Sequence, residues 1–306
     1  MNEVFDTIIV GAGAAGLTAG IYASRAKLNT LILNEGAVGG QMVLTEEIAN
    51  YPGLPITKGY ILANNMKMQA KSFGCKIKSN IKIAKYKLEG DIKSVELEDG
   101  RVFQGRTVIL TPGGKPRSLN IEGEDQFKGK GISYCATCDG DFFTGKEVVV
   151  VGGGNSALEE AVALTNYATK VTIVHQFDHF QAFQHAIVEA GKNPKINFVM
   201  ESELRGFYGN GSLQKVTIEH LPSGERSELK TDGTFIFIGY QPNTEDLKGV
   251  VALNDRNEIV VDADMKTNIA GVFAAGDCIN KHYRQVTTAV ADGTIAALSV
   301  SEYLRG

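Results

Sequence analysis

Cys135 and Cys138 are separated by two residues in the segment SYCATCDGDFF, residues 133–143. Two thiols at this spacing can close a small disulfide, and a nearby charge or helix end can lower one thiol pKa, so that thiol–disulfide exchange becomes fast. A zinc site would need two further ligands, and the sequence has no second Cys-x-x-Cys or histidine pair at metal spacing. The pair therefore predicts a redox dithiol and no metal.

A first glycine-rich turn, Gly11-x-Gly13-x-x-Gly16, directly follows the β-rich run FDTIIV and opens a segment with apolar residues at helical spacing. In this context the glycines allow close approach of a pyrophosphate to the N-terminus of the helix. A polar or acidic side chain about 20 residues further on is expected to hold a ribose. The next strand ends LILNEG, so either Asn34 or Glu35 takes that role.

A second glycine-rich turn, Gly152-x-Gly154-x-x-Ala157, stands between the strand KEVVVV and another helical segment. The backbone of a dinucleotide-binding unit is therefore expected again. An NADP site needs cations for the 2′-phosphate, and an NAD site needs an acid at the end of the second strand.

The stretch VTIVHQFDHFQA, residues 171–182, supplies neither of these charges at the strand end. Position 175 is histidine, and Asp178 reaches a ribose only if the strand end is extended. His175, His179 and His185 are bunched, but a strand end and a helix surface do not bring all three together. We interpret them as surface or capping histidines.

These motifs must be positioned by two βαβ units that begin about 140 residues apart. The breaker clusters TPGGKPR (111–117) and GYQPNT (239–244) separate them, while GVFAAGDC and an expected last helix over 284–303 complete the first unit. We expect an α/β protein with two Rossmann-like, three-layer ββα dinucleotide-binding-type domains, the second inserted into the first. The expected bounds are 1–116 with 243–306, and 117–242.

Composition narrows the class of protein further. The 306 residues are 43% hydrophobic and 22% charged, with a net charge of −4, which is typical of a globular protein and favours neither nucleic acid nor a membrane surface as partner. The sequence begins without a basic segment ahead of a long apolar run, so we expect a cytoplasmic protein without a membrane span. Cys75 and Cys278 are expected to be buried and unreactive.

Together the motifs resemble the low-molecular-weight thioredoxin reductases over essentially the whole chain. The matching segments are GAGAAG (11–16), GGQM (39–42), TEEIANYPG (45–53), TPGG (111–114), CATCDG (135–140), GGGNSALEEA (152–161), FIFIGYQPNT (235–244), VFAAGDC (272–278) and YRQVTTAVADG (283–293).

The resemblance implies that the first and last segments bind FAD. The residues implied at the cofactor are Gly11, Gly13, Ala14, Gly16, Asn34 or Glu35, Gly40, Gln41, Asn50, Thr111, Gly276, Asp277, Arg284, Gln285 and Val286. By the same likeness Asp277 contacts the ribityl chain of the flavin, and Gln285 and Val286 lie near its ring at the start of a helix.

The resemblance also assigns roles to the dithiol. Cys138 faces the flavin and receives its electrons, Cys135 attacks the disulfide of thioredoxin, and Asp139 is the proton donor or acceptor beside them. A carboxyl next to a departing thiolate can return its proton, so the arrangement is chemically reasonable.

One segment departs from the NADPH-dependent members, in which the second strand of this domain ends His-Arg-Arg and an arginine follows four residues later. Those three arginine positions are Gln176, Phe177 and Gln181 here. Tight binding of NAD(P)H is therefore not expected. The sequence is most similar in this respect to the ferredoxin-dependent flavin thioredoxin reductases, which implies ferredoxin as electron donor, thioredoxin as acceptor and a homodimer.

Alternatives stay open at this point. The chain could be an NADH- or NADPH-dependent reductase of the same dithiol, with Asp178 holding the ribose of NADH, or a non-catalytic flavin and dithiol sensor. An acidic ferredoxin would dock on a local cluster of cations, for which Lys281 and Arg284 are the candidates next to the inferred flavin loop.

Overall fold

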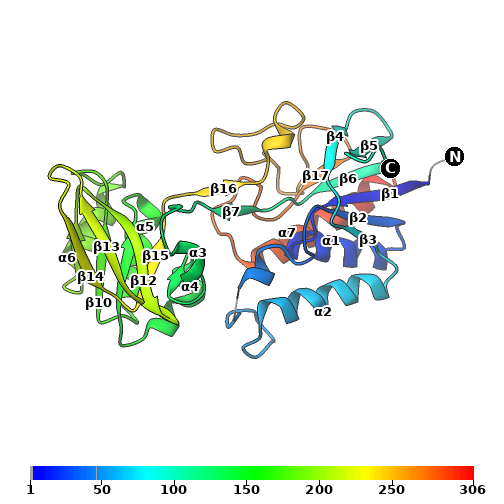
Figure 1. The fold of residues 1–306 in the computed structure, drawn as a ribbon. Helices are drawn as coiled ribbons and strands as arrows, with labels where there is room; N and C mark the ends of the chain where they lie inside the picture. Colours follow the sequence, from blue (N-terminus) through cyan, green and yellow to red (C-terminus); the bar gives the residue numbers. More distant parts are fainter. Residues whose placement is uncertain (1–2, 46) are drawn as a thin grey trace. The chain divides into compact units, whose positions relative to one another are not determined.

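The computed structural model describes residues 3–45 and 47–306, so that Glu46 of the TEEIANYPG segment and the first two residues lie outside the described part. The chain divides into two compact units (Figure 1). Unit 1 comprises Met1–Lys115 and Gln241–Gly306, and unit 2 comprises Pro116–Tyr240.

Unit 1 is built on a seven-stranded sheet in the order β3-β2-β1-β6-β5-β4, with β17 also pairing with β6. Its strands are β1 (Val4–Val10), β2 (Thr30–Asn34), β3 (Lys76–Ser79), β4 (Ile83–Lys87), β5 (Lys93–Leu97), β6 (Val102–Leu110) and β17 (Val272–Ala274). β1, β2, β3, β6 and β17 pair in parallel, whereas β4, β5 and β6 pair antiparallel.

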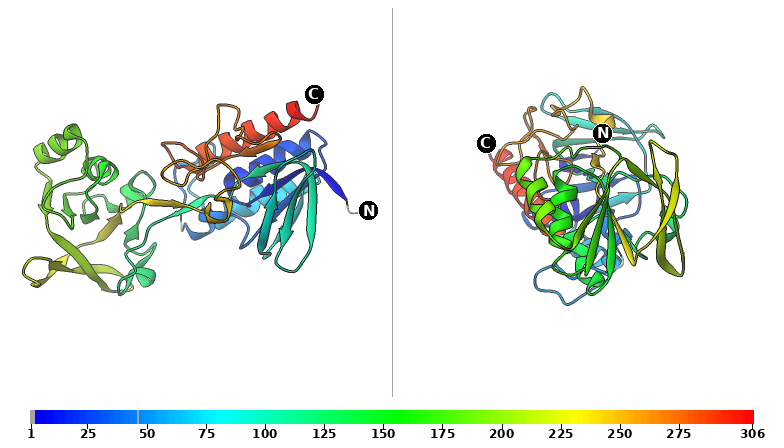
Figure 2. Two further views of the ribbon diagram at one scale, coloured as in Figure 1. Left: turned by 90° about the horizontal axis from the view of Figure 1, so that it is seen from above. Right: turned by 90° about the vertical axis from the view of Figure 1, so that its left-hand side faces the viewer.

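The helices of unit 1 are α1 (Ala14–Arg25), α2 (Gly59–Ser72) and α7 (Val286–Tyr303), with 3₁₀ turns η1 (Gly40–Leu44) and η3 (Glu245–Leu247). Strand side chains alternate between two cores: Ile9, Ile32 and Ile109 join the cluster formed with the helices, while Ile8 and Leu31 join the cluster on the opposite face. α1 and α7 pack side by side, blue and red in Figure 2.

Unit 2 has a parallel sheet in the order β11-β10-β9-β15-β8 and an antiparallel sheet β12-β13-β14. The strands are β8 (Ile132–Ser133), β9 (Glu147–Val151), β10 (Lys170–Val174), β11 (Ile196–Val199), β12 (Ser202–Asn210), β13 (Ser212–His220), β14 (Arg226–Lys230) and β15 (Gly233–Ile236). The helices are α3 (Glu124–Phe127), α4 (Ala136–Asp139), η2 (Gly140–Phe143), α5 (Asn155–Leu164) and α6 (Gln184–Lys192).

The parallel sheet of unit 2 is covered on both faces, which makes this unit a three-layer structure. Val148 and Val150 of β9 belong to the core shared with α5 and α6, whereas Val149 and Val151 belong to the core shared with β12 and β13. A run of consecutive valines is what a strand buried on both faces requires. The predicted α/β fold with two Rossmann-like units is confirmed.

The two breaker clusters expected between the units contain short strands. β7 (Gly114–Pro116) and β16 (Tyr240–Pro242) pair with each other as a two-stranded sheet where the chain passes from one unit to the other. α7 begins at Val286 rather than at the expected residue 284, because Gln285 is its N-cap, in a capping box with Thr288.

Candidate active site

The dithiol is closed as a disulfide in the structure. Cys135 and Cys138 are bonded, with their Cα atoms 5.3 Å apart, across the short helix α4. The backbone N–H of Cys138 donates to Cys135 Sγ at 3.2 Å. Both residues are half-buried, so the pair lies at the surface of unit 2 without being fully exposed.

Asp139 follows the dithiol and is also half-buried. Burial raises the pKa of its carboxyl, an effect that the hydrogen bond from Ser133 opposes and the nearby charge of Asp141 increases. Ser133 Oγ lies 2.5 Å from Asp139 Oδ2. A carboxyl with a raised pKa on the residue that follows Cys138 is suited to hold and release a proton during thiol exchange.

A second contact fixes the chain on the N-terminal side of Cys135. The Tyr134 hydroxyl donates to Glu124 Oε1 at 2.6 Å, and the same carboxylate accepts the backbone N–H groups of Leu119 and Asn120. Lys128 Nζ lies 5.0 Å from the centre of the Tyr134 ring. Glu124 is almost fully buried yet accepts several hydrogen bonds, so it acts as an anchor for this loop.

In unit 1 the first glycine turn connects β1 to α1. A Cβ atom on Gly11 would lie 2.1 Å from Thr111 O, and one on Gly16 would lie 2.0 Å from Gly11 O. Gly11 also has a φ of +107°, which favours glycine. A Cβ on Gly13 would meet nothing within 4 Å, so the open side of the turn is at Gly13. Ala14 is the first residue of α1.

Asn34 and Glu35, the two candidates for the ribose at the end of β2, make different contacts. Asn34 Oδ1 accepts the backbone N–H of Ala12 at 2.9 Å, and its amide nitrogen donates to Gly36 O at 2.6 Å. Asn34 therefore shapes the turn itself. Glu35 is exposed, and one carboxylate oxygen accepts the backbone N–H of Ile83 at 3.0 Å.

Gly40 of η1 and Gly276 pack against the same turn. A Cβ on Gly40 would lie 3.1 Å from Gly13 Cα, and one on Gly276 would lie 2.9 Å from the Cβ of Ala15. The structure thus brings together the glycine turn and two segments far away in the sequence.

Asp277 has a buried carboxylate oxygen whose hydrogen-bonding capacity is unused within the described residues. Its Oδ1 atom is buried and has no hydrogen-bond partner among the described residues, although Lys281 Nζ lies 3.7 Å away. Burial raises the pKa of this carboxyl, and the neighbouring cations Lys281 and Arg284 oppose the shift. Hydroxyl groups of FAD would donate to this buried acceptor, and the open glycine turn would receive the pyrophosphate.

Lys281 and Arg284 are held inside unit 1, which corrects the expectation that they form a docking cluster. Lys281 Nζ lies 2.6 Å from Asp292 Oδ2, and its side chain is only 12% exposed. Arg284 pairs with the buried Glu258. Sequence reasoning missed Asp292 and Glu258, because no local spacing signals a pairing between a loop and a distant segment.

Three of the remaining predicted cofactor residues, Asn50, Gln285 and Val286, lie at the start of α7. Asn50 Nδ2 donates to Gln285 Oε1 at 3.3 Å, which joins the segment after η1 to the N-cap of α7. Val286 is the first residue of that helix, and Gln41 lies exposed on η1.

The second glycine turn lies beside the segment 175–183. Gln181 N–H donates to Gly153 O at 2.8 Å, and the His175 ring occupies the space that a Cβ on Gly153 would need. Asp178 bonds to His179 at 2.6 Å. The segment contains no lysine or arginine, so a nucleotide at this turn would meet no permanent positive charge from it.

His175 is buried rather than at the surface, contrary to our interpretation. It is 5% exposed, its Nε2 atom lies 3.1 Å from His179 O, and burial lowers its pKa. Among residues 3–45 and 47–306, no group of three His, Cys, Asp or Glu side chains could hold a metal ion. Cys75 and Cys278 are buried, as predicted.

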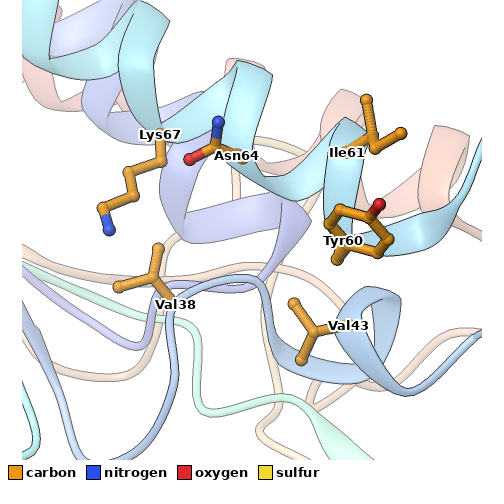
Figure 3. Close-up of a pocket in the computed structure, with 6 residues that line it drawn as sticks. All are labelled: Val38, Val43, Tyr60, Ile61, Asn64 and Lys67. Atoms are coloured by element: carbon orange, nitrogen blue, oxygen red, sulfur yellow. The ribbon is translucent and has the colours of Figure 1, made fainter.

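A hollow of about 410 Å³ lies between α2 and residues 38–43 (Figure 3). It is lined by Val38, Val43, Tyr60, Ile61, Asn64 and Lys67. None of these residues belongs to the dithiol or to the predicted cofactor set. Within the described part of the chain, no helix has both the length and the apolar character needed to span a membrane.

Residues 5–293 match the family model described as pyridine nucleotide-disulphide oxidoreductase. The chain is 46% identical to the "34.2 kDa protein in rubredoxin operon" of Clostridium pasteurianum, covering 100% of this chain and 99% of that protein. It is 44% identical to the thioredoxin reductase of Peptoclostridium acidaminophilum, and the match covers 99% of this chain and 98% of that protein. The crystal structure of thioredoxin reductase from Streptococcus pyogenes matches with a TM-score of 0.95 at 39% identity. The match covers 100% of this chain and 99% of that protein. The chain belongs to the low-molecular-weight thioredoxin reductase family of flavoprotein disulfide oxidoreductases.

Proposed function

We propose that this protein is an FAD-dependent thioredoxin reductase that takes its electrons from reduced ferredoxin and not from a nicotinamide nucleotide. Family membership supports a disulfide reductase with FAD and thioredoxin as cofactor and substrate. The single observation behind the choice of donor is the absence of lysine and arginine from the segment 175–183 beside the second glycine turn.

The energetic argument concerns the 2′-phosphate of NADPH. Hydrogen bonds to charged groups contribute roughly 1.5 to 3 kcal/mol each. The loss of two of them lowers affinity on the order of a hundredfold or more. Gln176, Phe177 and Gln181 offer no such charge, and the buried His175 has a lowered pKa that keeps it neutral near pH 7.

The NADH alternative depends on Asp178, and the geometry disfavours it. Asp178 lies beyond the end of β10 at Val174, and its exposed carboxylate is engaged by the neighbouring His179. That hydrogen bond lowers the pKa of Asp178. A ribose hydroxyl would compete with His179 for Oδ1 of this carboxylate.

The chemistry of the site follows from its own residues. Bound FAD supplies the conversion of single electrons into the pair that a disulfide requires. Cys138 receives that pair when the Cys135–Cys138 bond opens, Cys135 as thiolate attacks the substrate disulfide, and Cys138 then closes the bond to Cys135 again. Asp139 holds the proton that the departing thiolate takes up.

Ferredoxin as donor is thermodynamically downhill. A ferredoxin near −400 mV and a thioredoxin near −270 mV differ by about 130 mV, which for two electrons is about 6 kcal/mol. The reaction therefore needs no nucleotide as an additional source of driving force.

The test is anaerobic reduction of the protein, followed at the flavin absorption band, with reduced ferredoxin, NADPH or NADH as donor. We expect rapid bleaching with ferredoxin and little or none with millimolar NADPH. Rapid stoichiometric bleaching by NADPH or NADH, with none by ferredoxin, would refute the choice of donor while leaving the disulfide reductase intact.

A gain-of-function variant sharpens this test. Gln176→Arg, Phe177→Arg and Gln181→Arg together should raise kcat/KM for NADPH by about a hundredfold or more, because the missing charges are restored.

The matched control adds the same charge to unit 2 away from the glycine turn. Ser212→Arg, Gln214→Arg and Ser227→Arg lie at exposed positions of β13 and β14 and should leave NADPH use unchanged. An equal gain in both triple variants would mean that net charge alone, and not the segment 175–183, governs nucleotide use.

A further inference from the structure

The Ser133 hydroxyl contacts both the carboxyl of Asp139 and the backbone of Cys135. Ser133 is the last residue of β8, at the edge of the parallel sheet of unit 2, and is almost fully buried. Its Oγ atom lies 2.5 Å from Asp139 Oδ2 and 3.1 Å from the backbone nitrogen of Cys135, which donates to it. The carbonyl oxygen of Cys135 lies 3.3 Å from the same Oγ atom.

A serine hydroxyl has one proton to donate and two lone pairs to accept. When Asp139 is ionised, Ser133 accepts from Cys135 N–H and donates its proton to the carboxylate. When Asp139 is protonated, Ser133 can accept from both Cys135 N–H and the Asp139 carboxyl, and its own proton can turn to Cys135 O. Each protonation state of Asp139 thus has a complete set of hydrogen bonds, and the two sets differ at the backbone of Cys135.

The pKa of Asp139 depends on its hydrogen bond with the Ser133 hydroxyl. Burial raises its pKa, and Ser133 is the group that opposes the shift. The charged groups on the elements packed against α4 are Asp141 on η2 and Glu159 and Glu160 on α5, all of them acidic. The two thiols of the opened dithiol and the Tyr167 hydroxyl, whose ring packs against Gly140 at the end of α4, are further titratable neighbours.

We propose that the Ser133 hydroxyl is a positioning group that couples the protonation state of Asp139 to the backbone of Cys135, the attacking cysteine. The coupling deepens the proposed function and rests on it for the role of Asp139 as the acid of thiol exchange. When Asp139 gives its proton to a departing thiolate, the hydroxyl turns from Cys135 O to the new carboxylate. Ser133 thereby stabilises the ionised acid at the moment it forms.

The direct test is a pH titration by NMR of the full-length, FAD-loaded protein labelled with ¹³C-aspartate and ¹⁵N, with Asp139→Asn used to assign the carboxyl signal. In the wild type we expect the Cys135 amide signal to titrate together with the Asp139 carboxyl. In Ser133→Ala the Asp139 titration should move to higher pH by about one unit, the size expected for the loss of one charge-assisted hydrogen bond. The Cys135 amide should no longer follow it.

Two control variants separate this role from a structural one. Ser133→Thr keeps the hydroxyl and should restore both signals. Thr144→Ala removes a hydroxyl that bonds only locally to Asp141 O, and should change neither. If Asp139 titrates at the same pH in Ser133→Ala, or if Ser133→Thr behaves like Ser133→Ala, the proposal is wrong.

A kinetic readout distinguishes failure of the inference from failure of the proposed function. In chemically reduced protein the rate of attack on thioredoxin disulfide should fall as pH rises through the Asp139 pKa, because only the protonated acid can donate. Ser133→Ala should move that fall to higher pH. An NMR shift without any change in the rate profile would uphold the coupling and overturn the role of Asp139 as the acid.

Discussion

Cys135 and Cys138 differ from the other two cysteines in exposure and in hydrogen bonding. Burial raises the pKa of Cys75 to about 11 and that of Cys278 to about 12, so neither forms a thiolate near neutral pH. Cys135 and Cys138 are instead half-buried, and Cys135 Sγ accepts the backbone N–H of Cys138. The capacity for exchange is therefore confined to the bonded pair.

We predict that Cys135→Ser and Cys138→Ser each abolish thioredoxin reduction while the protein stays yellow with FAD. One remaining thiol cannot complete a two-electron exchange through an internal disulfide. Turnover with thioredoxin and the flavin absorption spectrum measure the two effects. Cys75→Ser is the control and should be nearly silent; a loss as large as that of Cys138→Ser would show that the dithiol is misassigned.

At the scale of elements, the start of α1 depends on close backbone packing. Gly11 and Gly16 lie against each other and against Thr111, at the end of β6, and a Cβ on Gly293 of α7 would lie 2.2 Å from Ala15 O. Small residues at these positions let α1 approach both the sheet and α7. Gly13 alone faces open space and is the point where a pyrophosphate can approach.

Alanine at Gly16 and at Gly13 should therefore have different effects. Gly16→Ala places a Cβ against the backbone and should lower the free energy of unfolding of the FAD-free protein by about 1 to 3 kcal/mol. Gly13→Ala should leave that stability nearly unchanged but weaken FAD binding. Denaturant unfolding and FAD titration measure the two effects. Equal loss of stability in both variants would contradict the packing argument.

At the scale of the whole molecule, each unit has its own hydrophobic cores. Both cores of unit 2 are formed only by residues between Pro116 and Tyr240, and both cores of unit 1 by residues outside that range. The predicted FAD residues lie in unit 1, and the dithiol lies in unit 2. The predicted FAD residues and the dithiol therefore lie in two units that have separate hydrophobic cores.

Residues 116–240 expressed alone should fold cooperatively, remain colourless and form the Cys135–Cys138 disulfide. A self-contained core predicts independent folding. Circular dichroism with thermal unfolding, and thiol titration before and after reduction, test this expectation. Phe235→Ala, which removes a fully buried ring, is the control and should lower the melting temperature. An isolated unit 2 without a cooperative transition would show that its fold depends on unit 1.

The whole enzyme is expected to be a homodimer by family likeness, which analytical ultracentrifugation of the FAD-loaded protein can check. A monomer at micromolar concentration would contradict that expectation. The donor test and the Ser133 test are unaffected by either result.

The sequence by itself determined the fold class, the glycine turns and the dithiol. These depend on local patterns: short runs rich in β-branched residues give strands, glycine at fixed spacing gives a turn before a helix, and two cysteines three positions apart at one short helix must lie close together. The proposal about the electron donor also begins from the sequence, because the absence of arginine from residues 171–182 can be seen without a structure.

The tertiary structure decided how side chains distant in sequence are paired. Lys281 has the sequence character of a surface cation, yet Asp292 and Asp277 hold it inside unit 1. His175 is buried against Gly153, and Glu124 anchors Tyr134 beside the dithiol. Whether a charged side chain is exposed, paired or buried depends on which elements pack over it. The local sequence does not specify these contacts between distant segments.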